Sequence, residues 1–236
     1  RSHNPDAGDL MPNIGRNLSQ IRERIARACL RAGRDPAGVT LIAVTKTVTA
    51  AEVIELYRLG IRDFGENRIA EGLVRKNTLA SSDARWHMIG HLQRNKAAVA
   101  LTGGFACVHS VESEKLLDIL DREAGRMGKR LEVFLEVNIS GEISKYGIPP
   151  DITGKLARSA AEKLNLDLRG LMTMAPLTDD PEKARPVFRE LARLRKDTET
   201  ESGIPLPHLS MGMSGDFEVA IEEGATLVRV GTALFA

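Results

Sequence analysis

The chain has little of what marks several large protein classes. Among its 236 residues only two are cysteines, 4% are aromatic, and the formal net charge is +1. Such a balance of charge gives no sign of binding to nucleic acid or to an anionic membrane surface. The sequence also has no apolar run near the roughly 18 residues needed to cross a bilayer. We therefore expect neither a nucleic-acid nor a membrane partner.

The two cysteines and the beginning of the chain bear on its location. Cys29 and Cys107 lie far apart, in different predicted elements, which argues against a disulfide framework. No apolar segment typical of a secretion signal occurs near the start. Together these absences predict a cytoplasmic protein. Residues 1–13 are expected to be a disordered start or a cloning scar.

No long linker and no low-complexity stretch divides the remainder, so residues 14–236 are expected to form one domain. An apolar stripe spaced by threes and fours predicts a helix over residues 14–32. From there eight strand-like segments alternate with seven helical ones. Strands are expected over residues 41–47, 62–65, 86–89, 106–110, 131–139, 168–174, 208–211 and 227–230. Helices are expected over residues 50–59, 66–77, 94–101, 112–127, 150–164, 181–201 and 217–223.

Alternation of strands and helices predicts a parallel sheet, and eight such units match the size of a single (β/α)₈ TIM-type barrel. An open doubly wound sheet is the alternative, but no G-x-G-x-x-G follows the first strand. The sequence stops at Ala236, soon after the eighth strand, so we expect no full eighth helix. The helix over residues 14–32 is expected to cover that gap.

The first strand, L-I-A-V-T-K-T over residues 41–47, brings a lysine, Lys46, to its carboxyl-terminal end. Taken alone, Lys46 is either a solvated residue leaving the strand or a functional amine. Barrel enzymes carry their reactive groups at this end of the strands. The residues at the ends of the other strands then indicate whether Lys46 is a solvated residue or a functional amine.

Two loops resemble halves of one anion site. Residues 210–216, S-M-G-M-S-G-D, follow the seventh strand and open a helix whose first amides carry partial positive charge. Gly231 and Thr232 follow the eighth strand, and barrels frequently bind a phosphate between these two loops. The alternative is a plain helix cap at Ser214 or Asp216 with glycines for tight turns.

A lysine amine and a phosphate site in one barrel mouth suggest a carbonyl compound with a phosphate, held as a Schiff base. Pyridoxal 5'-phosphate (PLP) and the sugar phosphate of a lysine-dependent aldolase both fit that description. An aldolase normally has its lysine late in the barrel, with carboxylates nearby. Here the lysine is on the first strand, and the main carboxylate at a strand end is Glu66.

Six motifs carry a resemblance to a known family. In chain order from residue 41 to the end, the sequence resembles the pyridoxal phosphate homeostasis protein family, whose barrel is similar to the N-terminal domain of bacterial alanine racemase. The motifs are V-T-K-T (44–47), F-G-E-N (64–67), W-H-M-I-G-H-L-Q-R-N-K (86–96), S-K-Y-G (144–147), L-S-M-G-M-S-G-D (209–216) and V-R-V-G-T (228–232).

The resemblance implies a cofactor and its binding residues. Lys46 would hold PLP covalently as a Schiff base. Ser214, Gly231 and Thr232 would bind the phosphate, and Arg229 would face the pyridine nitrogen. The expected function is to hold PLP for vitamin B6 homeostasis and to deliver it to PLP-dependent apoenzymes, as a monomer.

Three further residues would line the pocket by the same resemblance: Asn67, Ser210 and Met213. The sequence departs from the family at two points. The first strand reads V-T-K where V-S-K is usual, and the short tail that normally follows the last strand is missing.

Arg229 decides the expected chemistry. An arginine does not give up its proton, so it keeps the ring nitrogen unprotonated and weakens the electron sink that carbanion chemistry needs. Racemases of this fold add a second base from another domain. The chain has only two tyrosines, Tyr57 in a predicted helix and Tyr146 in a loop, and neither is expected to replace that base. Little or no turnover of amino acids is therefore expected.

Two other functions remain open: an amino-acid racemase of the alanine racemase type, and a Schiff-base aldolase acting on a sugar phosphate. No metal site is expected. His87 and His91 are four residues apart, but they straddle a strand end and therefore do not share a helical face.

Overall fold

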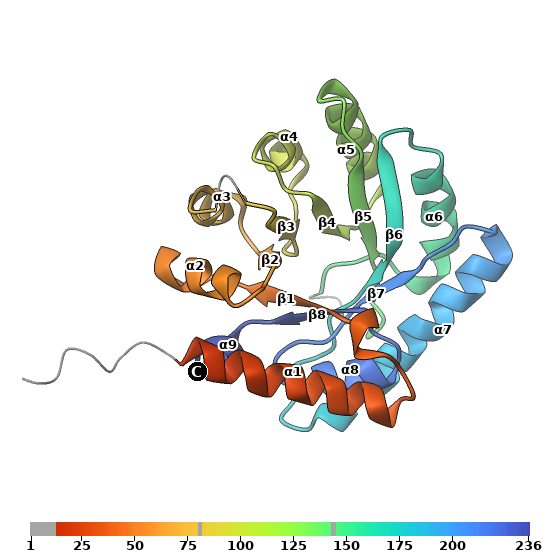
Figure 1. The fold of residues 1–236 in the computed structure, drawn as a ribbon. Coiled ribbons are helices and arrows are strands. Elements are labelled where there is room, and N and C mark those ends of the chain that lie inside the picture. Colours follow the sequence, from red (N-terminus) through yellow and green to blue (C-terminus); the bar gives the residue numbers. More distant parts are fainter. Residues whose placement is uncertain (1–12, 80–81, 143–144) are drawn as a thin grey trace, which may run out of the picture.

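In a computed structural model the chain forms a closed barrel of eight parallel strands surrounded by helices (Figure 1). The structure describes residues 13–79, 82–142 and 145–236. The strands follow one another around the barrel in sequence order, and the last strand pairs with the first. The predicted (β/α)₈ barrel is confirmed. The expected disordered start or cloning scar falls, except for Asn13, outside the described residues.

The strands are short, and each is followed by at least one helix. The strands are β1 (Thr40–Val44), β2 (Asp63–Glu66), β3 (Arg85–Met88), β4 (Cys107–Val111), β5 (Leu131–Glu136), β6 (Leu166–Met172), β7 (His208–Ser210) and β8 (Leu227–Val230). The α-helices are α1 (Ile14–Arg31), α2 (Ala50–Arg58), α3 (Ile69–Asn77), α4 (Ala97–Thr102), α5 (Glu114–Arg126), α6 (Thr153–Ala161), α7 (Arg185–Ser202), α8 (Phe217–Glu222) and α9 (Thr232–Phe235).

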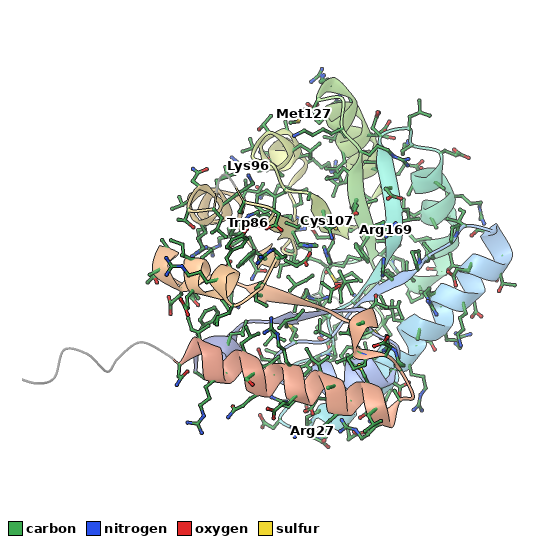
Figure 2. The ribbon with its side chains drawn as sticks, viewed as in Figure 1. Arg27, Trp86, Lys96, Cys107, Met127 and Arg169 are labelled. Atoms are coloured by element: carbon green, nitrogen blue, oxygen red, sulfur yellow. The ribbon has the colours of Figure 1, made fainter. Side chains whose placement is uncertain are left out.

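Side chains alternate between the two faces of each strand, which produces two apolar regions. Most buried residues pack between the strands and the ring of helices, as Phe64 and Trp86 do with ring centroids 5.0 Å apart. Figure 2 labels Trp86, which lies on β3 and is 1% exposed. A smaller cluster that includes Ile42, Cys107 and Phe134 lies inside the barrel. Apolar packing inside the barrel is therefore limited, and polar side chains fill much of the rest.

Helix α1 closes the side of the barrel next to β8 and β1. Its stripe of Ile14, Leu18, Ile21 and Ile25 is buried, and the helix packs against α2, α8 and α9. Its opposite face is exposed, and Arg27 points away from the barrel (Figure 2). Since α9 has only four residues, the expectation of no full eighth helix, with the first helix covering the gap, is confirmed.

Element boundaries differ from the expected ones by a few residues. The segments expected as helices over residues 94–101, 150–164 and 181–201 each begin with a short 3₁₀ turn before the α-helix. Prolines at the start of the last two favour such an entry, because proline fits the first turn of a helix. Among the described residues, we find no helix both long enough and apolar enough to span a membrane.

The packing of α1 gives a first prediction. Leu18→Ala removes a side chain that is 1% exposed, and we expect a loss of about 3 kcal/mol in the free energy of unfolding. Leu30→Ala on the same helix is the matched control, because Leu30 is 80% exposed. Urea unfolding of both variants measures the difference. Equal losses would contradict the assignment of the buried face.

Candidate functional site

The eight predicted site residues lie at the carboxyl-terminal ends of four neighbouring strands, β7, β8, β1 and β2. The pairing of β1 with β8 sets Ile42 opposite Arg229 and Ala43 opposite Val230. Residues from opposite ends of the sequence therefore meet at one part of the barrel mouth. They are Lys46, Asn67, Ser210, Met213, Ser214, Arg229, Gly231 and Thr232.

Lys46 lies in an exposed turn after β1, not within the strand. The expected strand is too long, because β1 ends at Val44. The backbone carbonyl of Lys46 accepts a hydrogen bond from Arg75 Nη2 at 2.9 Å, and that of Val48 accepts one from Arg75 Nε at 3.1 Å. A side chain of α3 thus binds the carbonyls of this turn and holds its backbone in a defined conformation.

Glu66 holds the arginine that supports this turn. Its Oε2 lies 3.1 Å from Arg75 Nη1, and its Oε1 accepts a hydrogen bond from the hydroxyl of Thr45. Glu66 is fully buried, and this burial raises the pKa of its carboxyl, against the opposing effects of Thr45 and Arg75. Glu66 faces α3, so it does not serve as the carboxylate of the mouth that an aldolase would need.

The loops after β7 and β8 form a cradle of hydrogen-bond donors. The hydroxyl of Ser214 accepts from the amides of Gly231 at 3.2 Å and Ala233 at 3.4 Å, which ties the two loops together. The backbone amides of Ser214, Gly215 and Thr232 donate to no acceptor among the described residues. Free amides at this point can bind an anion.

The helix after β7 contributes less to this cradle than its sequence suggests. The amides of Asp216 and Phe217, at the start of α8, donate to the carbonyl of Met213 at 3.1 and 2.9 Å. The amide of Met213 in turn donates to Asp216 Oδ1 at 2.6 Å. The turn before α8 therefore contributes free donors, and within α8 the amide of Phe217 is engaged, whereas those of Glu218 and Val219 donate to no acceptor among the described residues.

Two glycines permit the close packing of these loops. Gly212 has a φ of +95°, and a Cβ there would lie 2.6 Å from the Cβ of Ala220. A Cβ on Gly90, after β3, would lie 2.3 Å from the carbonyl oxygen of Asn67. Any larger residue would displace the loop after β7 or the backbone of Asn67.

Arg229 extends its guanidinium group across the barrel interior and is 4% exposed. Nη1 donates to the hydroxyl of Ser210 at 2.6 Å, and Nη2 donates to the carbonyl of Thr173 at 2.9 Å. Burial lowers the pKa of Arg229 to about 10, while the charges of Glu136 and Asp216 oppose that change. The group therefore stays protonated at neutral pH, fixed by β6 and β7.

Glu136, at the end of β5, is a second buried charge of the mouth. No donor among the described residues hydrogen-bonds its carboxyl group. Burial raises its pKa to about 7, with a further increase from Glu112 and an opposing effect from Arg229. Its charge therefore changes near neutral pH.

The two tyrosines have other contacts. The hydroxyl of Tyr57 on α2 donates to Asp83 at 2.6 Å. Tyr146 is 54% exposed, and its ring stacks on His91 with centroids 4.2 Å apart. The ring of Tyr146 thus packs against the loop after β3 that carries His91.

Three potential metal ligands lie together inside the barrel: His87, Cys107 and His109, with ligand atoms within 4.8 Å of one another. Figure 2 labels Cys107, which lies near the middle of the ring of strands. All four ring nitrogens of the two histidines are engaged in hydrogen bonds to other side chains. Burial raises the pKa of the Cys107 thiol well above its usual value. This arrangement does not favour a metal.

Several residues of the mouth were not predicted from sequence. Arg75 was unremarkable because it lies on a helix and acts on a turn. His109 and Glu136 had a usable signal, because alternation on β4 and β5 places them on the inner face of the barrel. No sequence signal predicted that the carbonyl of Thr173 accepts from Arg229.

Comparison with known proteins gives the same assignment as the motifs. The alanine racemase N-terminal domain family matches residues 16–236. The pyridoxal phosphate homeostasis protein of Aquifex aeolicus is 43% identical over 223 residues, which cover 94% of this chain and 97% of that protein. The protein of the same name from Pseudomonas aeruginosa is 42% identical over 225 residues, with 95% and 96% covered.

A solved structure is also similar along nearly its whole length. PipY of Synechococcus elongatus, determined with PLP bound, has a TM-score of 0.84 and 34% sequence identity. The match covers 95% of this chain and 100% of PipY.

The raised pKa of Glu136 predicts how stability depends on pH. A carboxyl whose pKa rises from 4.5 to about 7 on folding favours the folded state below pH 4.5, and this contribution is lost as the pH rises through 7. Glu136→Gln stays neutral. We expect its free energy of unfolding to exceed that of the wild type by on the order of 2 kcal/mol at pH 8, with a smaller excess at pH 5.

Urea unfolding at several pH values measures this difference. Glu201→Gln is the control, since Glu201 is exposed on α7. A constant difference between Glu136→Gln and wild type across the pH range would contradict the assignment.

Proposed function

The chain belongs to the pyridoxal phosphate homeostasis protein family, and we propose that it binds PLP in the barrel mouth and hands it over to other proteins. The observation that carries the proposal is the combination of a buried arginine and an anion cradle on adjacent strands. In this proposal residues 14–236 form one PLP-binding domain. Delivery to PLP-dependent apoenzymes, a cytoplasmic location and a monomeric state are parts of the same proposal.

The residues at the mouth fit the chemical groups of PLP. Free amides of Ser214, Gly215 and Thr232 suit a phosphate. The guanidinium of Arg229 uses two of its N–H groups on Ser210 and Thr173, so others are left to face a neutral ring nitrogen. These donors come from the loops after β7 and β8, on the side of the barrel where β1 ends.

Lys46 supplies the amine for covalent attachment in this proposal. When bound, PLP supplies an aldehyde that condenses with a lysine amine and a ring that withdraws electrons. Arg75 holds the carbonyls of the turn that carries Lys46, and Glu66 holds Arg75. The lysine side chain is left exposed, which suits an amine that must accept a ligand and release it.

In this proposal Arg229 limits the site to binding PLP. Its guanidinium stays protonated at neutral pH and offers no acceptor atom. It therefore neither gives a proton to the ring nitrogen nor accepts a hydrogen bond from a protonated ring nitrogen. With PLP bound, Arg229 would leave the ring a poor electron acceptor, and loss of the α-proton from an attached amino acid would be slow. Tyr57 and Tyr146 are engaged elsewhere and do not offer a base. We infer that little or no amino acid is turned over.

Lys46 provides the principal test. On addition of PLP and then borohydride, we expect a stable adduct on the peptide that contains Lys46, located by mass spectrometry. Lys46→Ala should lose both the adduct and the visible absorption band. Lys155→Ala, at an exposed position on α6, is the control and should keep both.

Other outcomes of this experiment would favour other functions. An adduct spread over surface lysines would refute covalent binding at Lys46. Trapping with a sugar phosphate but never with PLP would favour an aldolase. Rapid exchange of the α-proton of an amino acid that depends on Lys46 would favour a racemase.

The cradle predicts that affinity depends on the phosphate. The hydroxyl of Ser214 accepts two amides, so its own hydrogen is available to a phosphate oxygen. We expect Ser214→Ala to weaken PLP binding about tenfold, the size of one hydrogen bond to a charged group, and to leave pyridoxal binding unchanged. Ser159→Ala on α6 is the control. Equal losses for PLP and pyridoxal would place the phosphate elsewhere.

A further inference from the structure

A chain of hydrogen bonds runs through the interior of the barrel from Arg229. The hydroxyl oxygen of Ser210, which accepts a hydrogen bond from Arg229, lies 2.8 Å from Nδ1 of His109. Nε2 of His109 lies 3.0 Å from Nδ1 of His87. Nε2 of His87 lies 2.8 Å from Oδ1 of Asp63. The chain therefore connects the carboxyl-terminal end of β8 to the amino-terminal end of β2.

With His87 neutral, the two ends of this chain of hydrogen bonds set the direction of every bond in it. An ionised aspartate such as Asp63 only accepts, so Nε2 of His87 carries a hydrogen. In a neutral His87 the other nitrogen accepts, so Nε2 of His109 also carries a hydrogen. Nδ1 of His109 must then accept from the hydroxyl of Ser210, and that hydroxyl accepts from Arg229, which has only donors. Each group is satisfied with both histidines neutral.

The surroundings of the histidines support neutral rings. Both rings are buried, and His109 stacks on Phe134 with centroids 4.5 Å apart. Burial, together with the charge of Arg229, lowers the pKa of His109 well below its usual value. Each ring nitrogen of the two histidines has a side-chain partner, so no water is needed to pair it.

The far end of the chain lies at a second opening of the barrel. Asp63 lines a cavity of about 170 Å³ together with Arg85 and Glu132. Arg85 Nη1 lies 3.5 Å from Asp63 Oδ1, and Arg85 Nη2 lies 2.5 Å from Glu132 Oε2. Arg85 is therefore shared by two carboxylates, of which only Asp63 contacts a histidine of the chain.

We propose that Asp63, His87 and His109 are positioning residues for the cofactor pocket. They fix the hydroxyl of Ser210 as an acceptor toward Arg229, and so hold the guanidinium in one orientation at the pyridine nitrogen. This inference rests on the proposed PLP-binding function.

Loss of Asp63 should act at a distance on the pocket. Without an acceptor for its Nε2 hydrogen, His87 is free to carry the hydrogen on Nδ1, and the hydrogen of His109 then moves from Nε2 to Nδ1. Ser210 would receive two donors, from His109 and from Arg229, and its own hydrogen would have no partner in the chain. The orientation of Arg229 would be less well defined.

Nitrogen NMR on protein with isotope-labelled histidine tests the chain without PLP. In the wild type we expect neutral His87 and His109, each with its hydrogen on Nε2. Asp63→Ala should change the tautomer or charge of both rings, whereas Asp63→Asn, which keeps an acceptor oxygen, should preserve them. Glu132→Ala, the control in the same cavity, should leave both rings unchanged. Any other tautomer or charged rings in the wild type, or unchanged rings in Asp63→Ala, would refute the proposed series of hydrogen bonds.

The rate of PLP release tests the effect on the pocket. We expect release about tenfold faster from Asp63→Ala, and near the wild-type rate from Asp63→Asn and Glu132→Ala. Wild-type release from Asp63→Ala would overturn the positioning role even if the tautomers change. If the wild type binds no PLP, the proposed function fails, whereas the NMR result still decides whether the chain exists.

Discussion

Closure of the barrel by the pairing of β8 with β1 is the constraint on which the site depends. It brings Arg229 level with Ile42 and puts the loop after β8 beside the end of β1. Lys46 and Arg229 come from opposite ends of the sequence, and this pairing brings their strands together. The apolar face of α1 covers the same junction and packs against α8 and α9. The helix before the first strand is thus part of what holds the site together.

Much of this arrangement follows from reading the sequence by period and position. Alternating strands and helices predicted the barrel, and the rule that parallel strands end on one face predicted that Lys46 and the loops after the seventh and eighth strands share one mouth. The family resemblance added the expected roles of Arg229 and Asn67. Boundaries were less accurate, as at β1, because a side chain on α3 captures the carbonyls that would have continued the strand. Such a contact depends on tertiary structure that local sequence does not encode.

The pairings of the buried polar residues escaped prediction for one physical reason. Glu66, His87 and His109 are polar groups buried inside the fold, where each is paired with another polar side chain distant in sequence. Burial makes an unpaired polar group costly, so such residues occur in connected sets. Strand alternation indicates which face a residue occupies, but it does not indicate its partner across the barrel. Pairing therefore became visible only with the structure.

The buried arginine connects fold and function. Removing a guanidinium from water is unfavourable, which is why burial lowers the pKa of Arg229, yet the group is kept charged by Ser210, Thr173 and the field of nearby carboxylates. A protein that needed a strong electron sink would gain from a carboxylate at the ring nitrogen, since a carboxylate stabilises a protonated ring. In the proposed site, Arg229 at the ring nitrogen would favour a neutral ring and slow chemistry. In that proposal, the cost of burying the charge accompanies binding of PLP without consumption of substrates.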